Sequence, residues 1–138
     1  MKTFVFKHFG GKDLCSTEEE ARAVLRKEVS GTNEFRIYCE SDGYYPYVCV
    51  FIRGESAHIW YDPSDISSGF QAYVEDNGLD PDGLTVFHFE APETEMEVYN
   101  ECVIPRETAV ETVLAFMRRD DWPASPKDFP ACVEWDAL

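Results

Sequence analysis

Two pairs of apolar runs, each pair joined by a short turn, constrain the fold of this chain more than any other feature. The runs are "YVCVFIRG" (47–54), "AHIWYDP" (57–63), "LTVFHFEA" (84–91) and "EMEVYNECVI" (95–104). Short runs rich in β-branched and aromatic residues that flank a tight turn are typical of β-hairpins. Two more strand-like runs precede them, "TFVFKHF" (3–9) and "EFRIYCE" (34–40), and in the latter Phe35 and Ile37 face one way and Arg36 the other. The sequence therefore predicts a mainly antiparallel sheet of about five or six strands.

Two segments with helical periodicity complete the pattern. Ser16 and Glu19 match the capping box S-x-x-E, which predicts a helix that runs to the residue before Gly31. A second helix is predicted to start at Pro105, a residue favoured in the first turn, and to continue through "RETAVETVLAFMRR". The chain has no repeat and no linker. We therefore expect residues 1–138 to form a single α+β domain with both helices packed on one side of the sheet.

The chain ends in an unusually apolar run, "FPACVEWDAL" (129–138), although most chain ends are polar and frayed. The run predicts a short final strand, in which Trp135 anchors the end of the chain against the core beneath the second helix. Trp122 and Phe129 belong to the Pro-rich stretch around the start of this run, and we expect them to be exposed.

Negative charge is concentrated in the middle of the sequence. The formal net charge is −15, and residues 54–105 contain twelve Asp and Glu but no Lys or Arg. Residues 1–53 contain eight acids and eight bases, so this segment is neutral. A strongly acidic surface either keeps a protein soluble or steers a basic partner toward it. Because such a surface repels phosphates, the sequence argues against nucleic acid as a partner.

Several classes of function lack their sequence signatures. The chain has no apolar stretch long enough to span a membrane and no signal peptide, so we expect a cytoplasmic protein with no membrane partner. Its five cysteines form no CxxC pair and its three histidines lack zinc-binding spacing. Nucleophile-elbow and phosphate-loop motifs are also absent. We expect free thiols, no enzyme activity, no cofactor, no metal, and a monomer before any partner binds.

Aromatic and acidic residues near the predicted turns are candidates for a binding surface. Tyr and Trp inside an acidic rim have the composition of a protein-binding hot spot. The candidate partner-binding residues are Tyr44, Tyr45, Trp60, Asp62, Asp65, Glu93, Glu95 and Glu97. A second interpretation fits the same pattern. One aromatic of each adjacent pair then belongs to the core, and the glutamates that alternate with apolar residues face solvent.

The C-terminal third resembles a family of bacterial immunity proteins. The segment "VIPRETAVETVLAFMRRDDWPASPKDFPACVEWDAL" (103–138) contains a proline-initiated helix, a charged turn, a proline and the close Val133-Glu134-Trp135. This order is similar to the C-terminal signature of the first-numbered immunity family of polymorphic-toxin and contact-dependent inhibition systems. The hairpin "YVCVFIRGESAHIWY" (47–61) resembles the middle strands of that family. The likeness covers residues 45–138 and departs from the family in the long insertion "DDWPASPKDFPA" (120–131).

The resemblance implies a non-catalytic protein that binds a cognate toxin domain, a nucleic-acid deaminase or a nuclease, and occludes its active site. Enzymes that act on nucleic acid tend to have a basic cleft, to which an acidic segment with aromatic anchors is complementary. Two other hypotheses stay open. The chain is an acidic adaptor or regulatory protein for some other basic partner, or it is a small hydrolase or transferase that uses the carboxylates near residues 90–97.

Overall fold

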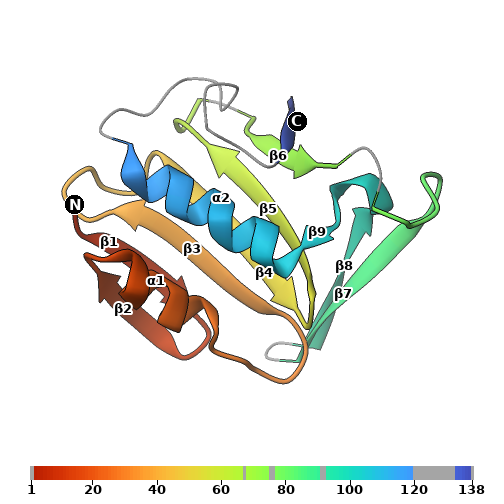
Figure 1. Ribbon diagram of the computed structural model, residues 1–138, viewed down its shortest axis with the longest axis horizontal. Coiled ribbons are helices and arrows are strands. Elements are labelled where there is room, and N and C mark those ends of the chain that lie inside the picture. Colours follow the sequence, from red (N-terminus) through yellow and green to blue (C-terminus); the bar gives the residue numbers. More distant parts are fainter. Residues whose placement is uncertain (1, 67, 75–76, 91–92, 120–132, 138) are drawn as a thin grey trace.

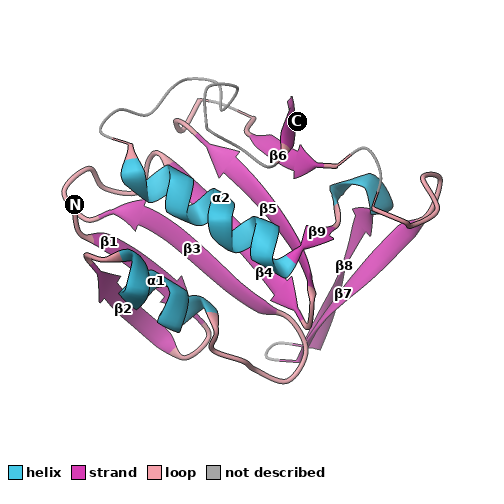
Figure 2. Cartoon of the chain, viewed as in Figure 1, coloured by secondary structure: helices cyan, strands magenta, loops and turns pink. Residues whose placement is uncertain are grey.

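The computed structural model describes residues 2–66, 68–74, 77–90, 93–119 and 133–137. In chain order its elements are β1 (Phe4–His8), β2 (Gly11–Cys15), α1 (Glu18–Leu25), β3 (Asn33–Cys39), β4 (Tyr47–Arg53), β5 (Ser56–Asp62), β6 (Phe70–Tyr73), β7 (Leu84–Glu90), β8 (Glu93–Tyr99), the 3₁₀ turn η1 (Asn100–Cys102), β9 (Ile104–Pro105), α2 (Arg106–Arg118) and β10 (Glu134–Ala137). Strands dominate and two helices accompany them (Figure 2), which confirms the predicted α+β class.

Most of the strands form one sheet in which neighbouring strands run antiparallel. The order across it is β10-β6-β5-β4-β3-β1-β2, and β9 pairs with the part of β5 that β6 leaves free. β4 lies in the middle of the sheet with nearly every residue buried, as its continuous apolar sequence predicts. The sheet has eight strands, which is more than the sequence predicts. The extra strands β2, β6 and β9 are too polar or too short to stand out as apolar runs.

Both helices cover the same face of the sheet, as predicted (Figure 1). Alternate residues of the strands point to this face and form the larger hydrophobic core together with apolar residues of the helices. Its central members are Phe35, Ile37, Val48, Val50, Ile59, Tyr61, Leu25, Val113, Leu114 and Phe116. Arg22 of α1 forms ion pairs with Glu107 and Glu111 of α2, so the two helices are also joined at their surface.

The opposite face of the sheet carries a second core beneath a separate two-stranded hairpin. β7 and β8 pair with each other and form a sheet of their own. Figure 1 shows them at the right-hand end of the main sheet. The second cluster contains Tyr47, Cys49, Phe51, Phe87, Phe89, Val98, Cys102 and Val103. The pairing of these two strands is confirmed. Their separation from the main sheet was not predicted, because a hairpin pattern does not say which other strand it joins.

The first helix begins one residue later than predicted. Thr17 is the N-cap, and its Oγ1 accepts the N–H of Glu20 at 3.1 Å. The Glu20 carboxylate in turn accepts the N–H of Ser16 at 3.0 Å. The predicted capping pair Ser16 and Glu19 is therefore wrong by one position. The stretch "STEEE" contains two overlapping matches to the capping box, and the sequence alone does not choose between them.

The same helix also ends earlier than predicted, at Leu25. The backbone N–H groups of Arg26 and Lys27 close its last turn by donating to Arg22 O and Val24 O. A distant side chain contributes as well, because Arg106 Nη2 donates to Leu25 O at 3.0 Å. Local and tertiary contacts together therefore satisfy the carbonyl groups at the end of this helix.

The run predicted as one strand over residues 95–104 is divided into β8, η1 and β9. The 3₁₀ turn redirects the chain from the hairpin back to the main sheet, where Pro105 lies opposite Ser56. Pro105 is the N-cap of α2 and precedes its first turn, whereas the sequence placed it inside that turn.

The end of the chain is docked, as its apolar residues predict. β10 pairs with β6 so that Trp135 lies opposite Ala72. Trp135 is half-buried against the larger core, and its ring centroid lies 6.4 Å from that of Tyr61. Trp122 and Phe129 fall outside the described residues, so their exposure stays a prediction.

Candidate functional site

The outer face of the β7–β8 hairpin gathers acidic and apolar side chains. Cross-strand partners share a face of a sheet, and the register places one set of partners on the side away from the second core. We call this set the acidic ribbon: Leu84, Val86, His88, Glu90, Glu93, Glu95, Glu97 and Tyr99. Its four glutamates are exposed and lie toward the turn of the hairpin. The exposed apolar side chains of Leu84, Val86 and Tyr99 lie toward the base.

The charge of the acidic ribbon is almost unopposed within the hairpin. Residues 84–99 contain no Lys or Arg. The nearest approach to an ion pair on the ribbon joins His88 Nδ1 and Glu95 Oε1 at 3.9 Å. Four carboxylates of one sign on a single strand pair create a negative potential in the surrounding water, which attracts a positively charged surface.

The hairpin is held against the main sheet by a close backbone contact at Gly31. The N–H of Thr32 donates to His88 O at 2.8 Å, and Gly31 forms a β-bridge with Phe89. A Cβ atom at Gly31 would lie 2.7 Å from His88 O, and the residue has φ of +83°. Only glycine fits both conditions without strain. Gly31 was predicted as a helix terminator, but its main structural role is to let the hairpin approach.

A buried amide network fixes the base of the hairpin. Asn100 is buried; its side-chain amide donates to Asp80 O at 2.8 Å, and its Oδ1 accepts the hydroxyl of Thr85 at 2.6 Å. Asn77 Nδ2 donates to Asn100 O and to Val103 O, the latter at 2.9 Å. Because these polar groups are satisfied by one another, the network defines a single arrangement of loop and hairpin. The acidic ribbon is therefore presented on a fixed support.

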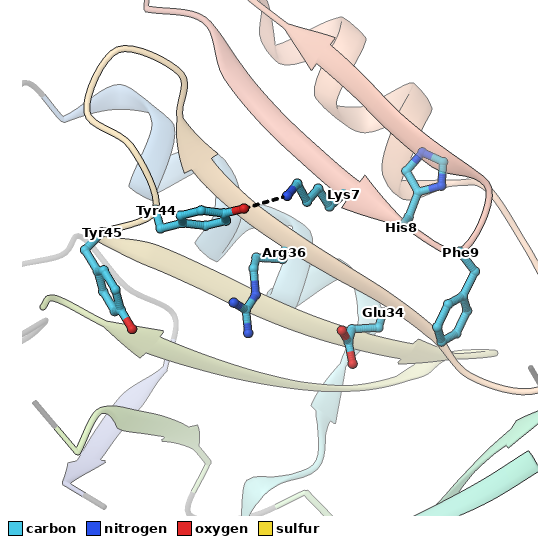
Figure 3. Close-up of a pocket in the computed structure, with 7 residues that line it drawn as sticks. All are labelled: Lys7, His8, Phe9, Glu34, Arg36, Tyr44 and Tyr45. Carbon is cyan, nitrogen blue, oxygen red and sulfur yellow. Dashed lines mark hydrogen bonds between the residues drawn. The ribbon is translucent and has the colours of Figure 1, made fainter. Parts of the chain in front are cut away.

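A cavity of about 570 Å³ opens over the sheet beside the hairpin. We call it the basic pocket, and it is lined by Lys7, His8, Phe9, Glu34, Arg36, Tyr44 and Tyr45 (Figure 3). Its floor is formed by β1 and β3. Figure 3 shows the two tyrosines at one end and Phe9 at the other, with Arg36 and Glu34 between them. The ring of His8 points away from the pocket, where its Nε2 lies 2.7 Å from Asp13 Oδ2.

Strand register brings three cations together on this face. Lys7 of β1 lies opposite Lys12 of β2 and Arg36 of β3. The Nζ atom of Lys7 donates to Tyr44 Oη at 3.1 Å and lies 4.8 Å from the centroid of the same ring. Arg36 Cζ lies 4.4 Å from the ring centroid of Tyr47. These contacts are cation–π interactions, which leave N–H groups of the cations free for other acceptors.

Carboxylates do not neutralise these cations. In the part of the chain that the structure describes, no carboxylate oxygen lies within 4.0 Å of Lys7 Nζ, Lys12 Nζ or the Arg36 guanidinium. The hydrogen bond from Lys7 lowers the pKa of Tyr44 below its ordinary value, and the charges of Lys7, Arg36 and Lys12 act in the same direction. The basic pocket therefore brings Lys7 and Arg36 together beside a single carboxylate, Glu34, on a protein that is strongly acidic in sum.

The structure distributes the sequence-predicted site residues over three places. Tyr44 and Tyr45 line the basic pocket. Glu93, Glu95 and Glu97 belong to the acidic ribbon.

The other predicted residues lie on or after β5. Trp60 is half-buried at the margin of the second core, where its ring meets Phe51 and His58. Asp62 is half-buried opposite Tyr47, and Asp65 is exposed in the loop that follows the strand. The predicted set is therefore not one surface.

Sequence reasoning missed Lys7 and Arg36 because it treated residues 1–53 as electrically neutral, and it missed Phe9 because that residue belongs to an apolar run predicted as a strand. A usable signal was present: Lys7 and Arg36 each occupy the polar side of an alternating run, and two such sides meet when the strands pair.

The amino-acid sequence matches no protein-family model, and a search of curated proteins finds no match. Among the described residues, no helix is long and apolar enough to cross a membrane, and no group of three His, Cys, Asp or Glu side chains is placed to hold a metal ion. Function therefore has to be argued from the two surfaces themselves.

Proposed function

We propose that this chain is a non-catalytic binding protein whose acidic ribbon docks onto a basic surface of a partner protein. The observation that carries the proposal is the composition of one face of the hairpin. It gathers four exposed glutamates and three exposed apolar side chains, with no Lys or Arg among them. A purely solvated face has no need of the apolar residues, whereas a docking face uses both kinds.

The two halves of the acidic ribbon have different roles in this proposal. Glu93, Glu95 and Glu97 attract the basic partner over distances of about a Debye length, roughly 8 Å at physiological salt, and so raise the association rate. Tyr99 is more than half exposed and Leu84 is about half exposed. Both side chains bury apolar area once the partner has arrived. The second core and the Asn100 network keep both halves in place, so little order has to be gained on binding.

The class of partner rests on the resemblance of residues 45–138 to the immunity proteins of polymorphic-toxin systems. In this proposal the partner is a toxin domain that acts on nucleic acid, such as a deaminase or a nuclease. Such a domain presents a basic cleft, and a negatively charged two-stranded hairpin that enters this cleft excludes the substrate. The acidic adaptor hypothesis uses the same ribbon and differs only in the identity of the basic partner.

The geometry favours binding over catalysis. A general acid or base works best in a site that shifts its pKa by burial or by a close partner. The carboxylates near residues 90–97 instead project from the open face of a hairpin and are exposed. Three of the described thiols are also poor nucleophiles, because burial raises the pKa of Cys15 and of Cys102 to about 11 and also raises that of Cys49.

The test is a comparison of two charge-reversal variants in a pull-down from the native cell lysate. The first variant carries Glu95→Lys and Glu97→Lys. We expect the wild-type chain to retain one basic protein at low salt and to release it as salt rises. The variant should lose most of this protein, and its association rate with the purified partner should fall roughly tenfold or more and depend less on salt.

The matched control carries Glu19→Lys and Glu40→Lys, which change the net charge by the same amount on α1 and after β3. Both side chains are exposed. This control should retain the partner at nearly the wild-type level. If the ribbon variant binds the same protein at an unchanged rate in low salt, the ribbon is not the docking surface. If nothing basic is retained by the wild-type chain, the proposed function is wrong.

A further inference from the structure

We infer that the basic pocket is a second, independent binding site, and that it takes a small anion in which a phosphate group is joined to a planar aromatic ring. A nucleoside monophosphate is the representative of this chemistry. The inference goes beyond the proposed function, because it concerns another surface and another class of ligand. It rests on the cations, the aromatic walls and the single carboxylate that the cavity brings together.

The middle of the pocket is suited to the phosphate. Arg36 offers a planar fork of N–H donors that matches phosphate oxygens, and Lys7 adds a point charge from the neighbouring strand. The hydroxyl of Tyr44 accepts from Lys7, which leaves its own proton available to a further acceptor. No described carboxylate within 4.0 Å competes for these groups. The donors are therefore assembled before the ligand arrives.

The walls of the pocket are suited to the ring. Phe9 is 40% exposed at one end, and its position is fixed by an edge-on contact with Phe89 of the hairpin at 6.1 Å between centroids. Glu34 stands between Phe9 and Arg36 (Figure 3) and can accept a hydrogen bond from an amino or hydroxyl group of the ligand. A ring that stacks on Phe9 places its phosphate toward Arg36 and Lys7. Stacking of a base on an aromatic side chain is a common source of affinity in nucleic-acid-binding proteins.

The size of the cavity and the charge around it select a small ligand over a polymer. About 570 Å³ lies within the range of small-molecule sites, roughly 300–1,000 Å³. The rest of the protein is acidic, with a formal net charge of −15. At physiological salt the remote acids are screened over roughly 8 Å, so a ligand inside the pocket is attracted by the near cations. A nucleic-acid strand extends beyond this distance and meets the acidic surface, which repels it.

The experiment is a calorimetric titration of the full chain with four probes: AMP, adenosine, inorganic phosphate and a single-stranded oligonucleotide. We expect AMP to bind one site and to bind at least tenfold more tightly than either adenosine or inorganic phosphate. We expect the oligonucleotide to bind more weakly than AMP. Equal affinity for AMP and inorganic phosphate overturns ring recognition. Oligonucleotide binding as tight as that of AMP overturns selection by size. No saturable AMP binding below about 1 mM overturns the site.

Two variants and a control locate the site. Arg36→Gln should weaken AMP binding at least tenfold, because it removes the charge-assisted, two-pronged hydrogen bonds of the guanidinium to the phosphate oxygens. Phe9→Leu should weaken AMP binding several-fold and leave inorganic phosphate unaffected. Arg26→Gln removes the same charge from an exposed position at the end of α1, and it should change neither affinity. Thermal unfolding of each variant shows that it is folded. If Arg26→Gln and Arg36→Gln weaken binding equally, the effect is one of net charge and the pocket is not the site.

Discussion

The acidic ribbon and the basic pocket lie side by side on the same side of the main sheet, yet they differ in charge, shape and origin. The ribbon is the outer face of a hairpin that packs over β4 and β5. The pocket lies beside this hairpin, over β1 and β3. The contact between Phe9 and Phe89 joins them. The hairpin therefore bounds both surfaces, because its outer face carries the negative charges of the ribbon and its inner face supplies Phe89 to the edge of the pocket.

The comparison shows that the net charge of a sequence segment does not describe the surface that the segment forms. Residues 1–53 are neutral in sum, but alternation along β1, β2 and β3 sends Lys7, Lys12 and Arg36 to one face. Many of the acids of this segment lie on the other side, where Glu18 of α1 pairs with Arg118 of α2 and Glu28 pairs with Arg106. The sheet thus separates charges that are mixed in the sequence.

Removal of the anchor of the hairpin is expected to have the largest effect. Phe87 is 1% exposed in the second core, so Phe87→Ala should lower the free energy of unfolding by about 3–5 kcal/mol. Val86→Ala alters the neighbouring residue, whose side chain belongs to the exposed ribbon. This substitution should change the free energy of unfolding by less than about 0.5 kcal/mol. Denaturant unfolding of both variants measures the difference. Similar values for the two would mean that the hairpin is not packed as described.

Because the two surfaces are independent in this proposal, a substitution in one surface should impair binding there and spare binding at the other. The ribbon variant with Glu95→Lys and Glu97→Lys should lose partner association roughly tenfold, while its AMP affinity changes by less than about threefold. Arg36→Gln should show the reverse. Calorimetry with AMP and association kinetics with the partner measure both quantities on both variants. If each variant impairs both activities, the two surfaces form one site and the distinction between them is wrong.

Acid is expected to weaken the hairpin side of the molecule, with an effect smaller than those above. Burial lowers the pKa of His58, and the hydrogen bond of its ring to Cys102 O at 3.0 Å offsets this only in part. The unfolded chain therefore takes up the proton at a higher pH than the folded one. The stability that this histidine contributes is complete above its ordinary pKa near 6.5 and is lost as the pH falls through the lower folded value.

Uptake of this single proton cannot change the free energy of unfolding by more than about 1.4 kcal/mol per pH unit. His58→Asn keeps a donor for Cys102 O and does not titrate. Denaturant unfolding between neutral and mildly acidic pH should give a shallower pH dependence for this variant than for the wild-type chain. Parallel curves would mean that His58 does not gain a proton on unfolding.

Local patterns in the sequence were enough to predict the strands and helices with the strongest periodicity. Phe35 and Ile37 alternate with Arg36, and β3 indeed buries the first two. The runs that flank Gly54 form the β4–β5 hairpin in a register set by their short turn. By contrast, β2 is mostly polar and β6 is only four residues long, so neither shows a visible periodicity, and both pair with the edge of a neighbouring strand.

The candidate sites were less predictable than the fold. Glu95 and Glu97 were correctly expected to alternate along a strand, whereas Glu93 was expected in the turn and instead begins β8. The structure places all three on one exposed face. Tyr44 and Tyr45 were grouped with those acids, but they lie in the connection between β3 and β4, at one end of these strands. The hairpin contacts Gly31 and Arg53 at the other end. Neither position along the chain nor residue type reveals such a separation, because it depends on which end of the sheet the hairpin joins.

The α+β class, the hairpins, the two amphipathic helices and the docked segment around Trp135 follow from the spacing of neighbouring residues in the sequence. Three other features follow from tertiary packing: β7 and β8 leave the main sheet, Gly31 receives them, and Lys7 lies opposite Arg36 beside Tyr44. The two kinds of feature differ because they depend on different contacts, one within an element and the other between elements. Periodicity reports burial within one element, whereas a binding surface is composed of elements that are distant in the chain and are brought together only when the apolar faces pack.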